Sequence, residues 1–411
     1  MDTMKRLQRL AQHDAAFLLL FIFLVALSLR GPVTGLPPLL DRISTDLNLS
    51  SSQSGLLTSL PLLAFAFFAP VASWLTRHFT IERILASGVG LIAIGMVIRT
   101  FGSISSLYLG AVFIGAGIAI GNVLLPSLLK REFPHHVVQL TAIYVLMMSI
   151  GGFLMSSFAV PLSLYAEQTT FHLPMSGWSF ALACQSLLIL LPLVVWFSCK
   201  ITQHQTSKTG NVEVATSVWR SVTAWQVASF LAVNSLINYI VVAWVPAILM
   251  SNGYTDSTAG LYQGYLQLAG AIPSLILAPF INRLGSHRRL CLFATGLTSL
   301  SVAGLLFIPS WSGVWSVSFG FGVSMGFILG LSFVSLRTNS PKQAAALSGM
   351  AQLIGYTLAA VGPVLIGALY DWHASWQAPL YVILAIGCVW MLLGWLASPT
   401  PQPTTKQEKS L

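Results

Sequence analysis

An all-α membrane protein is the fold class that the sequence predicts, on the evidence of its composition and its hydropathy pattern. Of the 411 residues, 55% are hydrophobic and only 8% are charged. A soluble chain of this length would carry roughly three times as many charges. Long apolar segments separated by short polar stretches recur along the whole chain, and the mean hydropathy is +0.79. This profile is typical of a polytopic helical membrane protein.

Twelve apolar segments are predicted to be transmembrane helices, because most of them exceed the length needed to cross roughly 30 Å of hydrocarbon. The first segment is too long for the core of a signal peptide and has no clear cleavage site, so it is also interpreted as a helix. The segments lie near Ala15–Leu40, Ser54–Trp74, Ile84–Ile98, Leu107–Leu129, Val138–Tyr165, Trp178–Ser198, Val222–Met250, Ala259–Ile281, Leu290–Ile308, Val314–Leu336, Ala345–Tyr370 and Ala378–Ala397.

Loop charges predict the orientation of these helices. With a cytoplasmic N-terminus and alternating loops, all but three of the 20 Lys and Arg residues face the cytoplasm. Arg42 and Arg99 then fall on the outer side, and Arg30 lies inside the membrane. The positive-inside rule therefore predicts that both termini are cytoplasmic. The same cytoplasmic excess accounts for the net charge of +9, so no nucleic-acid partner is predicted.

The chain is predicted to consist of two six-helix halves joined by a polar linker. Residues 1–199 form the N-terminal half, residues 200–221 the cytoplasmic linker, and residues 222–411 the C-terminal half with a short cytoplasmic tail. The linker is rich in Thr, Gln, Ser and Lys. The fourth segment ends in Lys130–Pro134 and the tenth in Arg337–Pro341. Such weak internal symmetry is typical of a duplicated transporter.

Arg30 is the most informative residue for function. It lies in a long apolar segment, and the next acid, Asp41, is about 16 Å further along a helix. A guanidinium stays protonated, and at mid-membrane it costs roughly 3 kcal/mol or more unless a partner meets it. A bound anion is the partner that suggests a function. The alternatives are water, polar groups of other helices, or carbonyls freed at the Pro37-Pro38 break.

Several strings resemble known transporter sequences. Twelve spans, a central cytoplasmic loop and two similar halves resemble the major facilitator superfamily, whose basic signature corresponds to Asn282–Arg289 and, in degenerate form, to Thr76–Phe79. Asn282 stands where the superfamily usually has Asp. Strings from much of the chain resemble the cyanate transporter/2-nitroimidazole transporter family: Leu29-Arg30, Pro38–Asp41, Gly55–Phe65, Gly121–Pro126, Trp244–Leu249 and Ala344–Gln352.

This resemblance implies a fold, a location and a function. The fold is that of the major facilitator superfamily, and the location is the bacterial inner (cytoplasmic) membrane. The implied function is secondary-active or facilitative transport by alternating access, with a small planar or anionic solute, cyanate- or nitroimidazole-like, as substrate. The substrate and the lipid bilayer are the expected partners, and a monomer is expected.

The resemblance also implies that the first, fourth, seventh and tenth helices line a central cavity, with the second, fifth, eighth and eleventh beside them. Helical spacing places Thr34 on the face of Arg30, and Asn234 and Asn238 on one face. The alternative for each amide is a structural hydrogen bond between helices. The predicted substrate-binding residues are Arg30, Thr34, Asn122, Tyr144, Asn234, Asn238, Tyr239, Gln267, Gln352 and Tyr356.

Charged residues at helix ends are predicted to serve gating or coupling. Arg131 and Arg337 are predicted to form cytoplasmic gate pairs or to contact lipid headgroups. No histidine or carboxylate is expected at mid-membrane, so proton coupling would use a helix-end acid, and Asp41 is the best candidate. The alternative interpretation of Asp41 is a solvated charge at the outer end of the helix, without a role in coupling. The sequence has no metal-ligand spacing and no Walker-type loop, so no metal, no cofactor and no enzymatic activity are predicted.

Two other functions stay open at this point. One is multidrug-type efflux of neutral hydrophobic compounds, in which Arg30 is structural and aromatic side chains bind the substrate. The other is a membrane receptor, although the soluble segments are too short for a sensor domain.

Overall fold

The computed structural model describes residues 2–76, 78–134, 136–168, 175–198, 218–276, 287–338 and 341–398. Every regular element in these ranges is a helix. The predicted linker therefore lies largely outside the described residues, as does most of the Asn282–Arg289 signature.

The helices that precede the linker, called the N-terminal helices below, run from α1 to α7. Their bounds are α1 Asp2–Thr34, η1 Pro37–Leu39, α2 Leu40–Leu47, α3 Ser51–Leu75, α4 Ile81–Arg99, α5 Ile104–Glu132, α6 Val137–Gln168 and α7 Gly177–Ser198. The C-terminal helices, α8 to α14, follow the linker. Their bounds are η2 Val218–Arg220, α8 Val222–Ser251, α9 Asp256–Ala269, α10 Ala271–Ile276, α11 His287–Phe307, η3 Pro309–Trp311, α12 Ser312–Leu336, α13 Pro341–His373 and α14 Gln377–Ala397.

Local sequence explains where these helices begin and break. Ser50 caps α3 and Ser103 caps α5, each through a reciprocal capping box. Pro37 and Pro38 cannot donate backbone hydrogen bonds, and α1 accordingly ends at Thr34 before the short η1 turn. The first membrane span therefore consists of α1, η1 and α2, with an irregular stretch just beyond Arg30.

Eleven spans in the described residues are long and apolar enough to cross a membrane. The predicted segment Ala259–Ile281 corresponds to α9 and α10, which are separated at Gly270, and its last residues lie outside the described part of the chain. The all-α membrane fold that composition predicted is confirmed.

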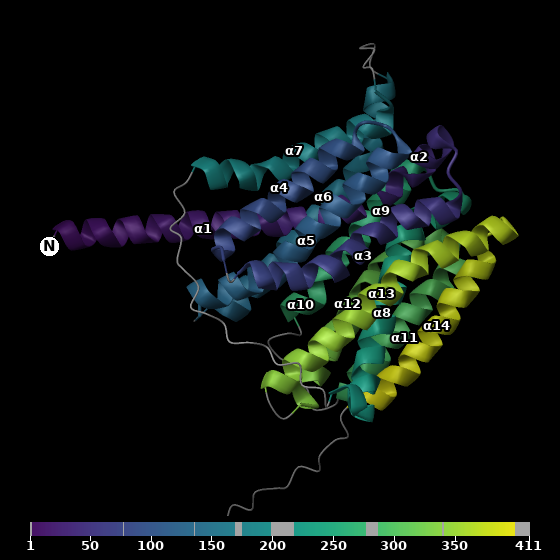
Figure 1. Ribbon diagram of the computed structural model, residues 1–411. Helices are drawn as coiled ribbons and strands as arrows, with labels where there is room; N and C mark the ends of the chain where they lie inside the picture. Colours follow the sequence, from purple (N-terminus) through teal and green to yellow (C-terminus); the bar gives the residue numbers. More distant parts are fainter. Residues whose placement is uncertain are drawn as a thin grey trace, which may run out of the picture.

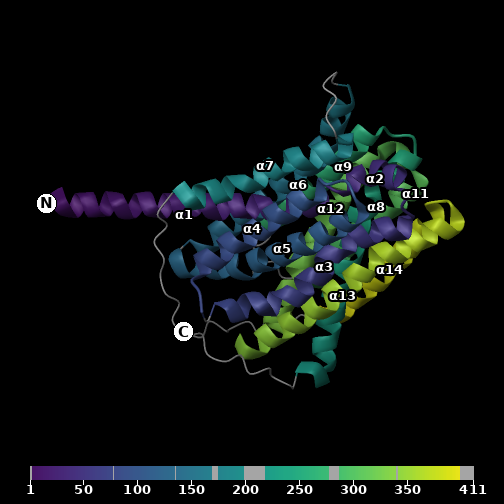
Figure 2. The ribbon, with the colours of Figure 1, turned by 45° about the horizontal axis from the view of Figure 1, so that its top comes forward.

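The N-terminal and C-terminal helices lie side by side as two groups in both views (Figures 1 and 2). The largest hydrophobic core lies wholly among α8–α14 and η2, and the next two lie among α1–α7. The two groups meet through α3 against α13 and α6 against α9. This arrangement puts α1, α5, α8 and α13 within reach of a shared centre.

Small residues allow the two groups to approach closely. A Cβ atom on Gly55 of α3 would lie 2.6 Å from the carbonyl oxygen of Pro363 in α13. A Cβ atom on Gly367 of α13 would lie 2.5 Å from the carbonyl oxygen of Ser51 in α3. We call this contact the α3–α13 seam. Side chains at these positions would have to push two backbones apart.

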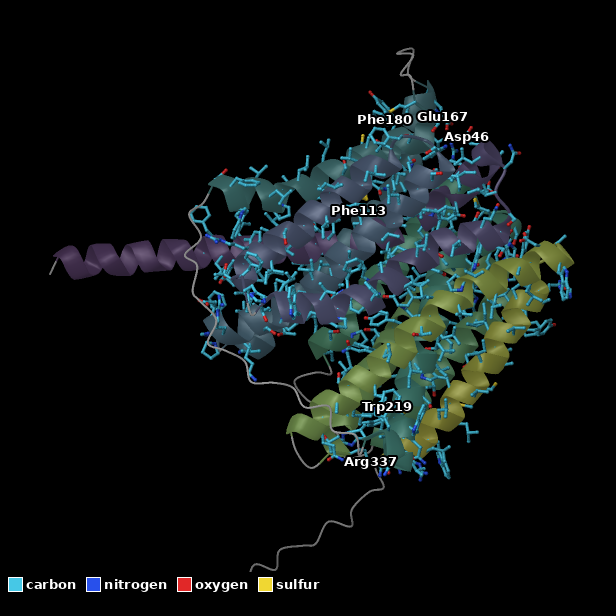
Figure 3. The ribbon with its side chains drawn as sticks, in the orientation of Figure 1. Asp46, Phe113, Glu167, Phe180, Trp219 and Arg337 are labelled. Carbon is cyan, nitrogen blue, oxygen red and sulfur yellow. The ribbon has the colours of Figure 1, made fainter. Side chains whose placement is uncertain are left out.

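The charged residues of the bundle are divided between its two ends. Figure 3 shows Arg337 and Trp219 at one end, which is predicted to be cytoplasmic, and Asp46 and Glu167 at the opposite end, which is predicted to be outer.

The orientation leads to a labelling prediction. Single cysteines at Ser207 and Thr405, both outside the described residues, are expected to react with an impermeant maleimide only after the cells are permeabilised, because positive loops stay in the cytoplasm. A cysteine at Asn252, between α8 and α9, is the control that should react in intact cells. Labelling of Ser207 or Thr405 variants in intact cells would reverse the assigned orientation.

Candidate functional site

The structure leaves the guanidinium of Arg30 without a protein partner. Arg30 lies in α1, four residues before the helix ends, and its side chain is only partly exposed. No hydrogen bond or ion pair joins the guanidinium to any residue in the part of the chain that the structure describes. Two backbone carbonyls at the end of α1 already accept hydrogen bonds from other donors. The hydroxyl of Thr34 donates to the carbonyl of Arg30, and the hydroxyl of Ser156 donates to the carbonyl of Thr34. Arg30 is therefore available for a bound group.

Three tyrosines surround this cation. Tyr144, Tyr239 and Tyr356 all interact electrostatically with Arg30, and they come from α6, α8 and α13. The hydroxyl of Tyr144 donates to Oδ1 of Asn122 in α5 at 3.3 Å. The site therefore draws side chains from both groups of helices.

Aromatic rings form one wall of the site. The ring of Tyr356 lies 4.2 Å from that of Phe65 in α3 and 6.5 Å from that of Tyr239, centroid to centroid. Tyr356 also packs against the core of the N-terminal helices and against the small apolar cluster of Leu62, Ala359 and Ala360 at the α3–α13 seam. A cation, hydroxyl donors and flat aromatic faces in one place suit a small solute that is negative at one edge and planar.

Two predicted amides are buried without partners. Oδ1 of Asn238 in α8 is buried and has no hydrogen-bond partner among the described residues, and neither polar atom of Gln267 in α9 has one there. Gln267 is fully buried, with its Cβ and Cγ against Gly152 of α6. Gly152 also lies beside Thr34. Gln267 thus belongs to the level of the α1 break, where α6 and α9 meet.

Other predicted residues are engaged elsewhere. Thr34 bonds to carbonyls of α1 and, at 3.4 Å, to the carbonyl of Gly152, so its hydroxyl joins α1 to α6. Asn234 donates to the carbonyl of Val323 in α12 at 2.9 Å, which is the structural alternative for an amide. Gln352 is exposed, one turn from Tyr356, and its amide lies 3.4 Å from the hydroxyl of Ser348.

The two predicted gating arginines contact only their own group of helices. Arg131 pairs with the buried Glu82 of α4 and, at 2.7 Å, with Glu132. Arg337 donates 2.7 Å and 3.4 Å bonds to carbonyls at the end of α14. Within the described part of the chain, neither arginine therefore forms a gate pair between the two groups at this end.

Ionic contacts between the two groups occur at the opposite end of the bundle. Arg42 of α2 donates to Asp256 of α9 at 2.6 Å and to Glu167 of α6 at 2.7 Å. Asp371 of α13 accepts 3.0 Å bonds from the backbone N–H groups of Ser51 and Ser52 at the start of α3. Sequence reasoning missed both contacts, the cap that Asp371 provides for α3 and the pair between Arg42 and Asp256.

Two further expectations meet the structure at this end. The carboxylate of Asp41 is exposed and accepts no hydrogen bond among the described residues. Arg99 is assigned by the sequence to the outer side of the membrane. It ends α4 but is fully buried, and it donates to the carbonyl of Pro32 at 2.9 Å.

No group of three metal-binding side chains is found in the described ranges.

A helical membrane protein with a polar site enclosed between two groups of helices is a solute carrier by architecture. A sequence model of the Major Facilitator Superfamily matches residues 17–360. The chain belongs to the major facilitator superfamily, whose members are transporters and not enzymes.

Known proteins agree with this assignment. The chain is 41% identical to the 2-nitroimidazole transporter of Escherichia coli (strain K12), over 91% of this chain and 93% of that protein. It is 26% identical to the cyanate transport protein CynX of the same organism, over 86% and 89%. A bacterial homolog of the human lysosomal transporter Spinster, solved in an inward-facing and occupied conformation, shares the fold with a TM-score of 0.78 at 15% identity, over 93% of this chain and 96% of that one. The predicted resemblance is confirmed.

Proposed function

We propose that this transporter moves a small planar or anionic solute, cyanate- or nitroimidazole-like, through a site centred on Arg30. The observation that carries the proposal is a partly exposed cation inside a membrane span, without an acidic or carbonyl partner among the described residues and near three tyrosines. An anionic group would meet the charge, and the hydroxyl of Tyr239 would donate to it. A second cation would be repelled, so cationic substrates are excluded from this proposal.

The distribution of contacts supports alternating access as the mechanism. Ionic contacts between the two groups of helices gather at the predicted outer end, around Arg42 and Asp371. The arginines at the predicted cytoplasmic end, Arg131 and Arg337, bind within their own groups. Rocking of the two halves about the site would exchange which end is closed. We place the protein as a monomer in the inner membrane, with both termini cytoplasmic.

A second candidate is efflux of neutral hydrophobic compounds. The aromatic wall of Phe65, Tyr239 and Tyr356 favours it, because such rings bind flat apolar solutes without any charge. The free guanidinium of Arg30 disfavours the efflux function, because a purely structural arginine would donate to backbone carbonyls, as Arg337 does.

Uptake into proteoliposomes tests the proposal. Labelled cyanate, benzoate and 2-nitroimidazole represent a small anion, a planar anion and a planar neutral compound, and a labelled cationic dye represents the excluded class. We expect saturable uptake of at least one of the first three and none of the dye. Uptake of the cationic dye, or of none of the first three solutes, would favour the efflux function instead.

We expect that Asp41 contributes little to any coupling between transport and protons. Its carboxylate is exposed and solvated, so Asp41→Asn should leave uptake within about twofold of wild type, and exchange between loaded vesicles should survive collapse of the pH gradient. The measurement is uptake with and without an imposed gradient. Steep dependence on that gradient, lost in Asp41→Asn, would make Asp41 the coupling residue.

A further inference from the structure

We propose that Arg99 is a specificity-determining residue that adds a second uncompensated positive charge behind the Arg30 site. The inference rests on the proposed anion site. It assigns to Arg99 the role of raising the positive potential at that site from the far side of α1, and so of favouring anions over neutral solutes of the same shape.

Arg99 is held inside the bundle against the break in α1. Its side chain is 0% exposed, and its Nη1 donates to the carbonyl of Pro32 at 2.9 Å. That carbonyl belongs to the residue two positions after Arg30, about 3 Å along the helix axis at 1.5 Å per residue. Arg99 comes from α4, so two different helices bring a guanidinium to the same stretch of α1.

No acid balances this charge. The ion pairs among the described residues involve Arg42 and Arg131 only, and neither Nε nor Nη2 of Arg99 has a hydrogen-bond partner there. A guanidinium remains protonated, so the site keeps both charges. A neutral side chain such as glutamine could cap a carbonyl without the desolvation cost of a buried ion, which amounts to several kcal/mol. Capping alone therefore does not account for an arginine at this position.

A second unpartnered polar atom borders the same break. Gln185 of α7 is buried and donates from Nε2 to the carbonyl of Met155 at 3.0 Å, while its Oε1 has no partner among the described residues. That oxygen lies 2.8 Å from the position where a Cβ of Gly35 would stand. Gln185 is uncharged, so it leaves the charge of Arg99 in place. A glutamate here would set a negative charge beside the break.

The expected effect is large enough to measure. An α-helix is about 10 Å wide, so Arg99 and an anion at Arg30 would lie on the order of 12 Å apart on opposite sides of α1. At an effective dielectric constant of about 20, one unit charge at that distance changes anion affinity about tenfold. Water in an open site would reduce this to about threefold.

The test measures potential at the site without needing a substrate. A single cysteine replaces the partly exposed Asn122, in the full chain with Cys184, Cys199, Cys291 and Cys388 changed to serine. The cysteine is reacted with two methanethiosulfonates, an anionic sulfonatoethyl reagent and a neutral hydroxyethyl reagent. The ratio of the anionic rate to the neutral rate reports the electrostatic potential at the site. The matched pair is Gln185→Glu against Gln185→Met, since both lose the bond to Met155. The second pair is Arg99→Met against Arg99→Lys.

We expect the anionic-to-neutral ratio to fall threefold to tenfold in Gln185→Glu relative to Gln185→Met, and by a similar factor in Arg99→Met relative to Arg99→Lys. A fall in either pair supports the proposal, and equal ratios within every pair that folds overturn it, leaving Arg99 as a helix cap. Because the ratio needs no transport, this result is separate from the fate of the proposed function. If Arg99→Met does not fold, the Gln185 pair decides alone.

Discussion

Arg30→Ala is expected to abolish uptake of the anionic substrate, by at least a hundredfold, while the protein still inserts and folds. The free guanidinium is the only strong anion partner that the site offers, so its removal takes away the contact that distinguishes the substrate from water. Because the change also removes an unpaired charge from inside the membrane span, the melting temperature of the purified protein should not fall. Uptake into proteoliposomes and thermal unfolding in detergent are the two measurements.

Arg30→Lys separates charge from geometry. An ammonium keeps the positive charge but offers a single point in place of a planar fork, so uptake should be nearly as poor as in Arg30→Ala if the substrate is held by two parallel hydrogen bonds. Transport by Arg30→Ala at the wild-type rate would show that no anion binds at Arg30.

Gly55→Leu is expected to arrest transport with the outer end unable to close. The new side chain would meet the backbone of Pro363 at the α3–α13 seam, where even a Cβ lies 2.6 Å from the carbonyl oxygen. Leucine favours helix more than glycine does, so α3 itself is not weakened. Uptake should drop more than tenfold because one of the two end states is blocked.

The conformational part of this prediction has its own measurement. A cysteine at the buried Leu62, beside Ala359 and Ala360, should be labelled from outside faster in Gly55→Leu than in the parent. Gly90→Leu is the matched control, because a Cβ on this α4 glycine meets nothing within 4 Å. Normal uptake and unchanged labelling in Gly55→Leu would mean that the seam does not need to close.

The helices and the central cation could be predicted from the sequence because hydropathy alone reveals them. An arginine inside an apolar run stands out, and the tyrosines follow once the helices that face the centre are known. Finer assignments depended on helix rotation. Asn234 and Asn238 share a stripe, yet the first bonds to α12 while Oδ1 of the second stays unpartnered among the described residues. Spacing places two side chains on one face but does not say which neighbour that face meets.

Contacts between distant segments could not be predicted in this way. Arg42 and Asp256 are 214 residues apart, and each appears in isolation as a charge near a helix end. Arg99 follows an apolar segment, so it resembles a residue at the membrane surface. Its burial results from packing against α1, where the Pro37-Pro38 break leaves a carbonyl for it to cap. Only the assembled bundle reveals these partners.

Arg42 holds one acid from each group of helices, and this has a kinetic consequence. When the outer end separates, Glu167 leaves with Arg42 and only Asp256 loses its partner. The guanidinium is never stripped of all carboxylates, so the activation free energy of separation includes the loss of one ion pair that is already partly hydrated. Dissolved salt would weaken that pair further. Under the proposed rocking mechanism, the ionic strength of the solution at this end would therefore change the rate at which the two groups separate there.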